Sequence, residues 1–103
     1  MLDFSLIEGF DWDSGNATKS EHKHAVSQQE AEQVFFNLPL LWVDDMVHSQ
    51  VEQRFQLMGH TDADHKLHIT FTLRESGTLL RVISAREMSA RERKTYDHQD
   101  RKN

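Results

Sequence analysis

The hydrophobic residues of this chain follow two different periods, and the period changes at Pro39. In residues 26–38 the apolar side chains recur every three or four positions, which is typical of an amphipathic helix. They are Ala31, Val34, Phe35 and Leu38. Ser27 and Glu30 form the sequence pattern of a capping box, and proline cannot continue a helix. We therefore predict a helix that begins after Ser27 and ends at Pro39.

The residues before this helix give weaker signals. Asp13 or Ser14 provides an N-cap, and a polar stretch continues from there to about His24, so we expect a first, weaker helix. Residues 1–9 alternate loosely between apolar and polar. We expect them to form an edge strand or an ordered N-terminal extension.

After Pro39 apolar and polar residues alternate, as they do in strands with one buried face. The clearest case is "KLHITFTLR" (66–74), where Leu, Ile, Phe and Leu alternate with His, Thr, Thr and Arg. Three further strands are predicted at 40–43, 51–60 and 78–84. Ser89 and Glu92 repeat the capping-box pattern and predict the start of a final helix.

This order of elements predicts an α+β fold. Strands joined by short turns favour an antiparallel meander, with helices packed on one face and the other face left polar for a ligand. The chain has 103 residues, which is enough for one domain with a single core. We expect a single domain over 1–103, with residues 97–103 as a polar tail.

Charge is distributed unevenly along the chain. The net charge is −5, but residues 74–103 carry 8 Lys and Arg against 5 Asp and Glu. Nucleic acids respond to local potential, so this asymmetry is compatible with an RNA partner, and a solvated charged tail is the alternative. The chain contains no cysteine, no apolar run long enough to span a membrane, and no signal peptide pattern. We expect a cytoplasmic protein without a membrane partner.

The seven histidines do not predict a metal site. His22 and His24 are two residues apart, so a helix would point them to different faces. His65 and His68 have no adjacent set of carboxylates or cysteines to complete a site. We expect these histidines to make surface or partner contacts, and we expect no metal and no cofactor.

Arginines on the polar sheet face are the best candidates for chemistry. Arg74 belongs to this face, and Arg54 is a further candidate. Arg81 and Arg86 are five residues apart, so a regular strand would point them to opposite faces, and the sequence leaves open which one joins it. Arginines on a rigid sheet can hold a phosphate bidentately and stabilise charge in its transition state. RNA supplies its own nucleophile, the ribose 2′-OH, so neither a metal nor a covalent residue is required.

Four segments of the sequence resemble the BrnT family of toxins in order and spacing. They are "FDWD" (10–13), "KHAVS" (23–27), "RFQLMGH" (54–60) and "RVISAREMSARERKTY" (81–96). The resemblance therefore covers residues 10–96. It implies an endoribonuclease of a type II toxin–antitoxin pair with a RelE-like fold, which cleaves RNA and inhibits translation. It also implies a hetero-oligomer with a neutralising, BrnA-like antitoxin, through which alone the toxin would contact DNA.

The resemblance also nominates site residues. We expect His24 to be the general acid or base, and Arg74 and Arg86 to clamp the phosphate. The expected RNA-binding residues are Lys23, Arg54 and Arg81.

Each of these residues also has a structural alternative. Lys23 and His24 could complement the dipole at a helix C-terminus, and Arg54 could pair with a carboxylate across the sheet. Arg81 and Arg86 could tie the last strand to Asp11 or Asp13. Three cations further on would form a solvated helix face or an antitoxin-facing one; they are Arg91, Arg93 and Lys94.

Two other functions compete with the ribonuclease hypothesis. The first is a catalytically inactive module of the same fold that engages an antitoxin-like protein. The acidic net charge favours it, as does Ala25 where the family usually has glycine. The second, a DNA-binding protein, is weaker because the sequence has no helix-turn-helix pattern. Unpartnered expression discriminates the first two, since only a catalytic toxin would arrest growth.

Overall fold

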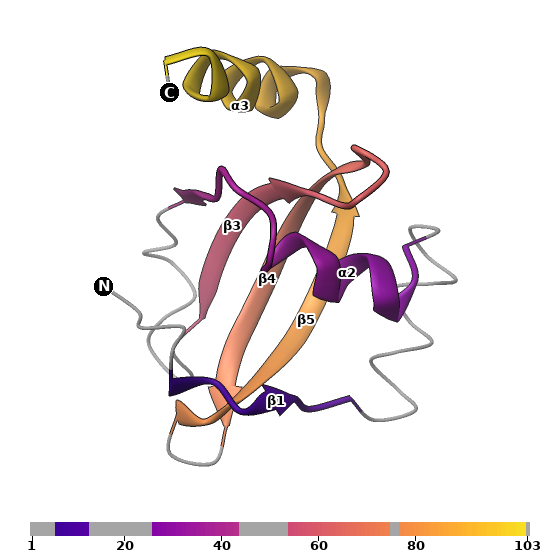
Figure 1. Cartoon of the computed structure of the whole chain (residues 1–103), viewed down its shortest axis with the longest axis vertical. Coiled ribbons are helices and arrows are strands. Elements are labelled where there is room, and N and C mark those ends of the chain that lie inside the picture. The colour runs from indigo at the N-terminus through magenta and orange to yellow at the C-terminus, as the bar shows by residue number, and fades with distance from the viewer. Residues whose placement is uncertain (1–5, 13–25, 44–53, 75–76, 103) are drawn as a thin grey trace.

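The computed structural model describes residues 6–12, 26–43, 54–74 and 77–102. Figure 1 shows a curved sheet with one helix across a face and another at one end. The elements are β1 (Gly9–Phe10), α2 (Gln28–Val34), β2 (Leu41–Val43), β3 (Phe55–His60), β4 (Lys66–Arg74), β5 (Leu79–Glu87) and α3 (Ala90–Lys102). The α+β prediction is confirmed, whereas the helix expected before residue 24 lies outside the described residues. None of the described helices is long and apolar enough to cross a membrane.

The sheet is mixed, which corrects the prediction of a purely antiparallel meander. Its five strands lie in the order β1-β5-β4-β3-β2. The four strands from β2 to β5 pair antiparallel with their neighbours in sequence, as short connections favour. β1 pairs parallel with β5, with Gly9 opposite Leu79 and Phe10 opposite Leu80. Residues 11–78, which include α2 and three strands, separate β1 from β5, so the short-turn argument does not apply to this pair.

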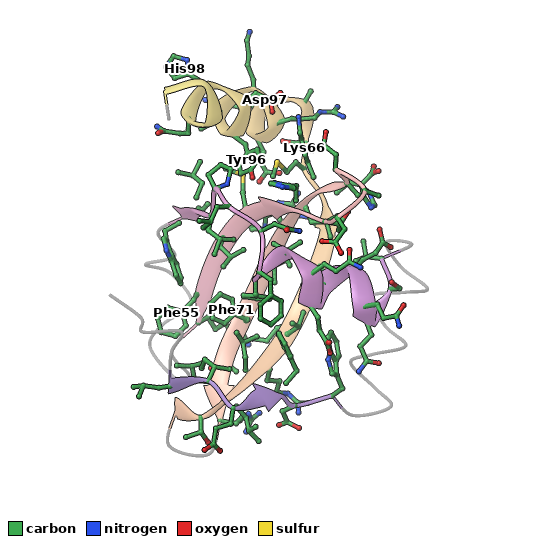
Figure 2. All side chains as sticks on the ribbon, in the orientation of Figure 1. Phe55, Lys66, Phe71, Tyr96, Asp97 and His98 are labelled. Carbon is green, nitrogen blue, oxygen red and sulfur yellow. The ribbon has the colours of Figure 1, made fainter. Side chains whose placement is uncertain are left out.

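The core lies between α2 and one face of the sheet. Ala31 and Val34 of α2 are buried together with the apolar residues of the strands. On β4 these are Leu67, Ile69 and Phe71, which are fully buried as the alternation of this segment predicts. Around Phe71 the rings of Phe35 and Phe55 lie 5.2 and 5.4 Å away between centroids, and Figure 2 shows Phe55 beside Phe71. The main core thus fills one face of the sheet, and a smaller apolar cluster of Met58, Met88 and Tyr96 lies on the other face, toward α3.

Helix α2 begins as predicted but ends earlier. The Ser27 hydroxyl accepts from the Glu30 amide at 3.1 Å, and the Glu30 carboxylate accepts from the Ser27 amide at 3.2 Å, which confirms the capping box. The helix stops at Val34, not at Pro39, because the following amides bond to carbonyls three residues back, as in a closing turn. Leu38, expected on the apolar face, is therefore 81% exposed.

Helix α3 lies across the end of the sheet where β5 finishes (Figure 1). It includes most of the residues expected to be a polar tail, since it continues to Lys102. Tyr96 anchors it: the side chain is 1% exposed, and its hydroxyl donates to the Pro39 carbonyl at 2.7 Å. The same hydroxyl lies 2.8 Å from Nδ1 of His60. Figure 2 shows Tyr96 directed from α3 toward the sheet.

Candidate functional site

A β-bulge in β5 decides which arginines share a face of the sheet. Thr70 lies opposite Ser84, but the next residue, Phe71, lies opposite Val82. Ile83 is therefore an extra residue on β5, and the alternation of side chains shifts by one position there. Arg81 and Arg86, five residues apart, consequently point to the same face. Their partners, Thr72 and His68, are four residues apart on β4 and confirm this.

This face is the one that α2 leaves uncovered, and we call it the polar face. β4 contributes His68, Thr70, Thr72 and Arg74, and β5 contributes Arg81, Ser84 and Arg86. Gln56 and Met58 of β3 continue it, because they lie opposite Thr70 and His68. Arg54 stands two residues before Gln56, immediately outside β3, and is half-buried. The arginines predicted from the sequence thus gather along one side of the sheet.

The register of the strands separates Arg74 from Arg86, which we expected to clamp one phosphate together. Arg86 lies opposite His68, which precedes Arg74 by six residues on β4. At about 3.3 Å per residue this is a separation of roughly 20 Å along the strands, which favours separate phosphates for the two arginines. Arg81, opposite Thr72, lies between them. The three arginines therefore form a strip along the sheet, in which Arg81 lies closer to Arg74 than to Arg86.

Arg86 is held by a residue that the sequence analysis did not place in the site. Its two terminal nitrogens donate to the two carboxylate oxygens of Glu92 at 2.8 and 2.9 Å. Glu92 also caps α3, accepting from the Ser89 amide at 2.8 Å while its own amide donates to the Ser89 hydroxyl at 3.1 Å. The Arg86 guanidinium lowers the pKa of Glu92 from 4.5 to about 2, so this carboxylate is charged at neutral pH. It occupies the bidentate position that a phosphate would take.

His68 is the second residue that was missed. It is 6% exposed, lies opposite Arg86 in the sheet, and places Nε2 3.8 Å from a carboxylate oxygen of Glu92. The signal was present, because the alternation in residues 66–74 assigns His68 to the polar face. His68, Arg86 and Glu92 form a compact cluster of an imidazole, a guanidinium and a carboxylate, whose components can transfer a proton and bind an oxyanion.

The remaining predicted residues fall into three groups. Arg81 donates to Asp11 at 3.5 Å, as its structural alternative anticipated, because β1 brings Asp11 alongside β5. Arg74 is exposed at the far end of the strip. Lys23 and His24 lie outside the described residues, so their roles stay predictions.

A separate ionic cluster joins α2 to the ends of β4 and β5. His65 lies between two carboxylates, with Nδ1 2.7 Å from Glu30 and Nε2 2.8 Å from Glu87. The hydrogen bond to Glu30, more than that to Glu87, raises the pKa of His65, and the same bond lowers the pKa of Glu30. Lys66 donates to Asp97 at 2.7 Å, and Figure 2 shows this pair between the sheet and α3. These contacts account for His65 structurally.

Within the described ranges, no three His, Asp or Glu side chains come together in an arrangement that could hold a metal ion. The exposed Arg91, Arg93 and Lys94 lie on α3 outside the polar face strip. Among the described residues, the groups that could act on a ligand at the polar face are therefore its arginines, His68 and Glu92.

Comparisons with known proteins show a family and a solved structure to which this chain is similar. Residues 12–92 match the model of a family described as the ribonuclease toxin, BrnT, of type II toxin–antitoxin systems. The structure is similar to the 1.1 Å crystal structure of the Brucella abortus ribonuclease toxin, BrnT, with a TM-score of 0.58 and 17% sequence identity. That match covers 79% of this chain and 96% of the Brucella chain, and at this identity it speaks for the fold alone. A search of curated protein sequences gives no match.

Proposed function

Because the chain belongs to the BrnT family of ribonuclease toxins of type II toxin–antitoxin systems, we propose that it is itself an endoribonuclease toxin. It cleaves RNA in the cytoplasm, inhibits translation, and is neutralised by a cognate, BrnA-like antitoxin with which it forms a hetero-oligomer. The observation that supports this most is the bulge at Ile83, which brings Arg81 and Arg86 onto one face with Arg74 and His68. The fold is proposed to be of the RelE-like kind.

The geometry supports a specific path for the RNA. The RNA strand lies along the strip of arginines, with the scissile phosphate at Arg86 and more distant phosphates of the same strand at Arg81 and Arg74. To bind at Arg86, the phosphate replaces the Glu92 carboxylate, which already demonstrates that two oxygens fit this guanidinium. Arg54 and Lys23 supply further contacts to the backbone.

Cleavage then needs two proton transfers. The 2′-oxygen attacks the adjacent phosphorus, its proton passes to a base, and the departing 5′-oxygen takes a proton from an acid, which leaves a 2′,3′-cyclic phosphate and a 5′-hydroxyl. We assign one transfer to His24, on the strength of the resemblance, and the other to His68, which lies opposite Arg86. Arg86 stabilises the charge that develops on the phosphate oxygens. This mechanism requires no metal ion.

The test is cleavage of a long RNA by the purified protein in EDTA, with and without ribosomes. Wild type is compared with Arg86→Gln, His68→Gln and His24→Gln, and with Arg93→Gln as the matched control, because Arg93 is an exposed arginine outside the strip. We expect loss of roughly 100-fold or more for Arg86→Gln and for each histidine variant, and no change for Arg93→Gln. Full activity in folded Arg86→Gln would refute the proposed site.

One observation favours a second function, a non-catalytic module that engages an antitoxin-like protein. In this structure Glu92 fills the bidentate position of Arg86, so the pair already serves to hold α3 on the sheet. A module of this kind would leave growth and bulk mRNA unaffected when expressed without its partner. A catalytic toxin would arrest growth, and Arg86→Gln would relieve the arrest.

A further inference from the structure

A groove opens beside the Arg86 cluster, between β2 and α3. Its volume is about 440 Å³, within the range of small-molecule sites. The strand side is apolar and is lined by Leu41, Val43 and Met58. The helix side is polar and includes Glu92, the residue that holds Arg86. The groove is therefore continuous with the proposed phosphate site.

The sheet register fixes how far apart the two sites are. Leu41 lies opposite Met58, Met58 opposite His68, and His68 opposite Arg86, so these four residues form one row across β2 to β5. Neighbouring strands are about 4.8 Å apart, which places Met58 roughly 10 Å from Arg86. A nucleobase attached to the sugar next to a phosphate at Arg86 can reach this distance.

The polar side of the groove can read the edge of a base. Thr95 and Gln99 both line it and are four residues apart on α3, so they share one face of the helix. The Thr95 hydroxyl donates to the Arg91 carbonyl at 3.2 Å, so its oxygen is left to accept a hydrogen bond from a ligand. The Gln99 amide can both donate and accept. An apolar wall with a few edge hydrogen bonds is how proteins bind an unstacked base.

We propose that this groove is the subsite for a nucleobase next to the scissile phosphate, and that Thr95 and Gln99 determine which base is accepted. The inference rests on the proposed ribonuclease function. Arg91 also lines the groove, and its positive charge can bind the phosphate of a nucleotide. An apolar side chain of a protein partner would carry no such group, so Arg91 favours a nucleotide as the occupant.

Two measurements test the proposal with Thr95→Val and Gln99→Met, which approximately keep the side-chain shape and remove the edge hydrogen bonds. The first maps cut sites on a long RNA of mixed sequence at low conversion. The second measures binding of four fluorescent hexanucleotides, each of a single base and 2′-O-methylated to prevent cleavage. Thr95 and Gln99 are exposed, so the variants should fold, and urea midpoints check this. Arg93→Gln is the matched control on α3, since Arg93 does not line the groove.

We expect the wild type to prefer one base beside the cut, and each groove variant to reduce this preference about five- to tenfold. Arg93→Gln should keep the wild-type preference. The proposal is overturned if the wild type cuts RNA without base preference, or if both groove variants keep it. Loss of antitoxin binding with unchanged base preference would overturn it in favour of a protein occupant. A folded wild type that neither binds nor cuts RNA would refute the proposed function itself, and the inference with it.

Discussion

Replacing Glu92 with glutamine should separate the electrostatic role of this residue from its role as a helix cap. Glutamine can occupy the same position of a capping box and can still accept one hydrogen bond from Arg86, so the variant mainly removes a charge. The lowered pKa of Glu92, about 2 against 4.5, corresponds to at most ~3.4 kcal/mol of stability at neutral pH. Arg86 is 38% exposed and Glu92 24%, so solvent screening reduces this to roughly 1–2 kcal/mol.

The direction in which the stability changes with pH follows from the lowered pKa of Glu92. A carboxylate whose pKa is lower in the folded protein stabilises it above its ordinary pKa, and this stabilisation is lost as the pH falls toward the folded value. The free energy of unfolding should therefore differ by roughly 1–2 kcal/mol between wild type and Glu92→Gln at pH 7, and by less than about half of that at pH 3.

The assay is urea unfolding at pH 7, 5 and 3, with circular dichroism as the probe of the folded state. It includes Arg86→Gln and the double variant, because the double-mutant cycle isolates the energy of the pair. A coupling energy below about 0.3 kcal/mol at pH 7 would refute the reasoning, since that is within the additivity expected of independent sites. So would a coupling energy that stays constant from pH 7 to pH 3.

Three further predictions concern stability. His65→Gln should destabilise the protein by about 1 kcal/mol at pH 5.5, where His65 is charged beside Glu30. The loss of stability should become smaller as the pH rises through the raised pKa of His65 in the folded protein, which urea unfolding across pH 5.5–9 measures. Gly59→Ala should lower the free energy of unfolding by roughly 1–3 kcal/mol, because the new Cβ would lie 2.7 Å from Cγ1 of Val34. Gly9→Ala is the control: its Cβ would have its nearest contact at 3.8 Å, so it should be nearly neutral when both variants are compared by thermal unfolding. Tyr96→Phe removes the hydrogen bond to the Pro39 carbonyl and should lower the free energy of unfolding by about 1–2 kcal/mol. Amide hydrogen exchange should accelerate more in α3 than in β4. Unchanged exchange in α3 would contradict the role of Tyr96 as an anchor of this helix.

The elements that the sequence predicted well are those decided by neighbouring residues. The alternation of residues 66–74 reproduces β4 from end to end. Both capping boxes form, because Ser27 and Ser89 need only a glutamate three residues later. The end of α2 was misjudged because Leu38 continues the helical pattern of apolar residues although the backbone has already turned away.

The features that the sequence could not supply depend on pairing between distant strands. Nothing in "RVISAR" distinguishes a regular strand from one with an extra residue, because Ile83 becomes a bulge only through the register of β5 against β4. The shared face of Arg81 and Arg86 follows from that register. The contact of Glu92 with Arg86 likewise requires α3 to turn back over the end of the sheet. His24 and Lys23 remain predictions from resemblance.

The acidic net charge of −5 is a poor measure of what the polar face offers to RNA. On this face two of the arginines are already matched by carboxylates, Arg81 by Asp11 and Arg86 by Glu92. A phosphate that binds either arginine exchanges one anion for another, so RNA binding gains less from each contact than the number of arginines implies. The exchange also separates the two proposed functions. In a toxin that binds RNA at Arg86, Glu92→Gln must raise RNA affinity even as it lowers stability. In a module whose Arg86 serves only to hold α3, the same substitution lowers stability and leaves RNA affinity unchanged.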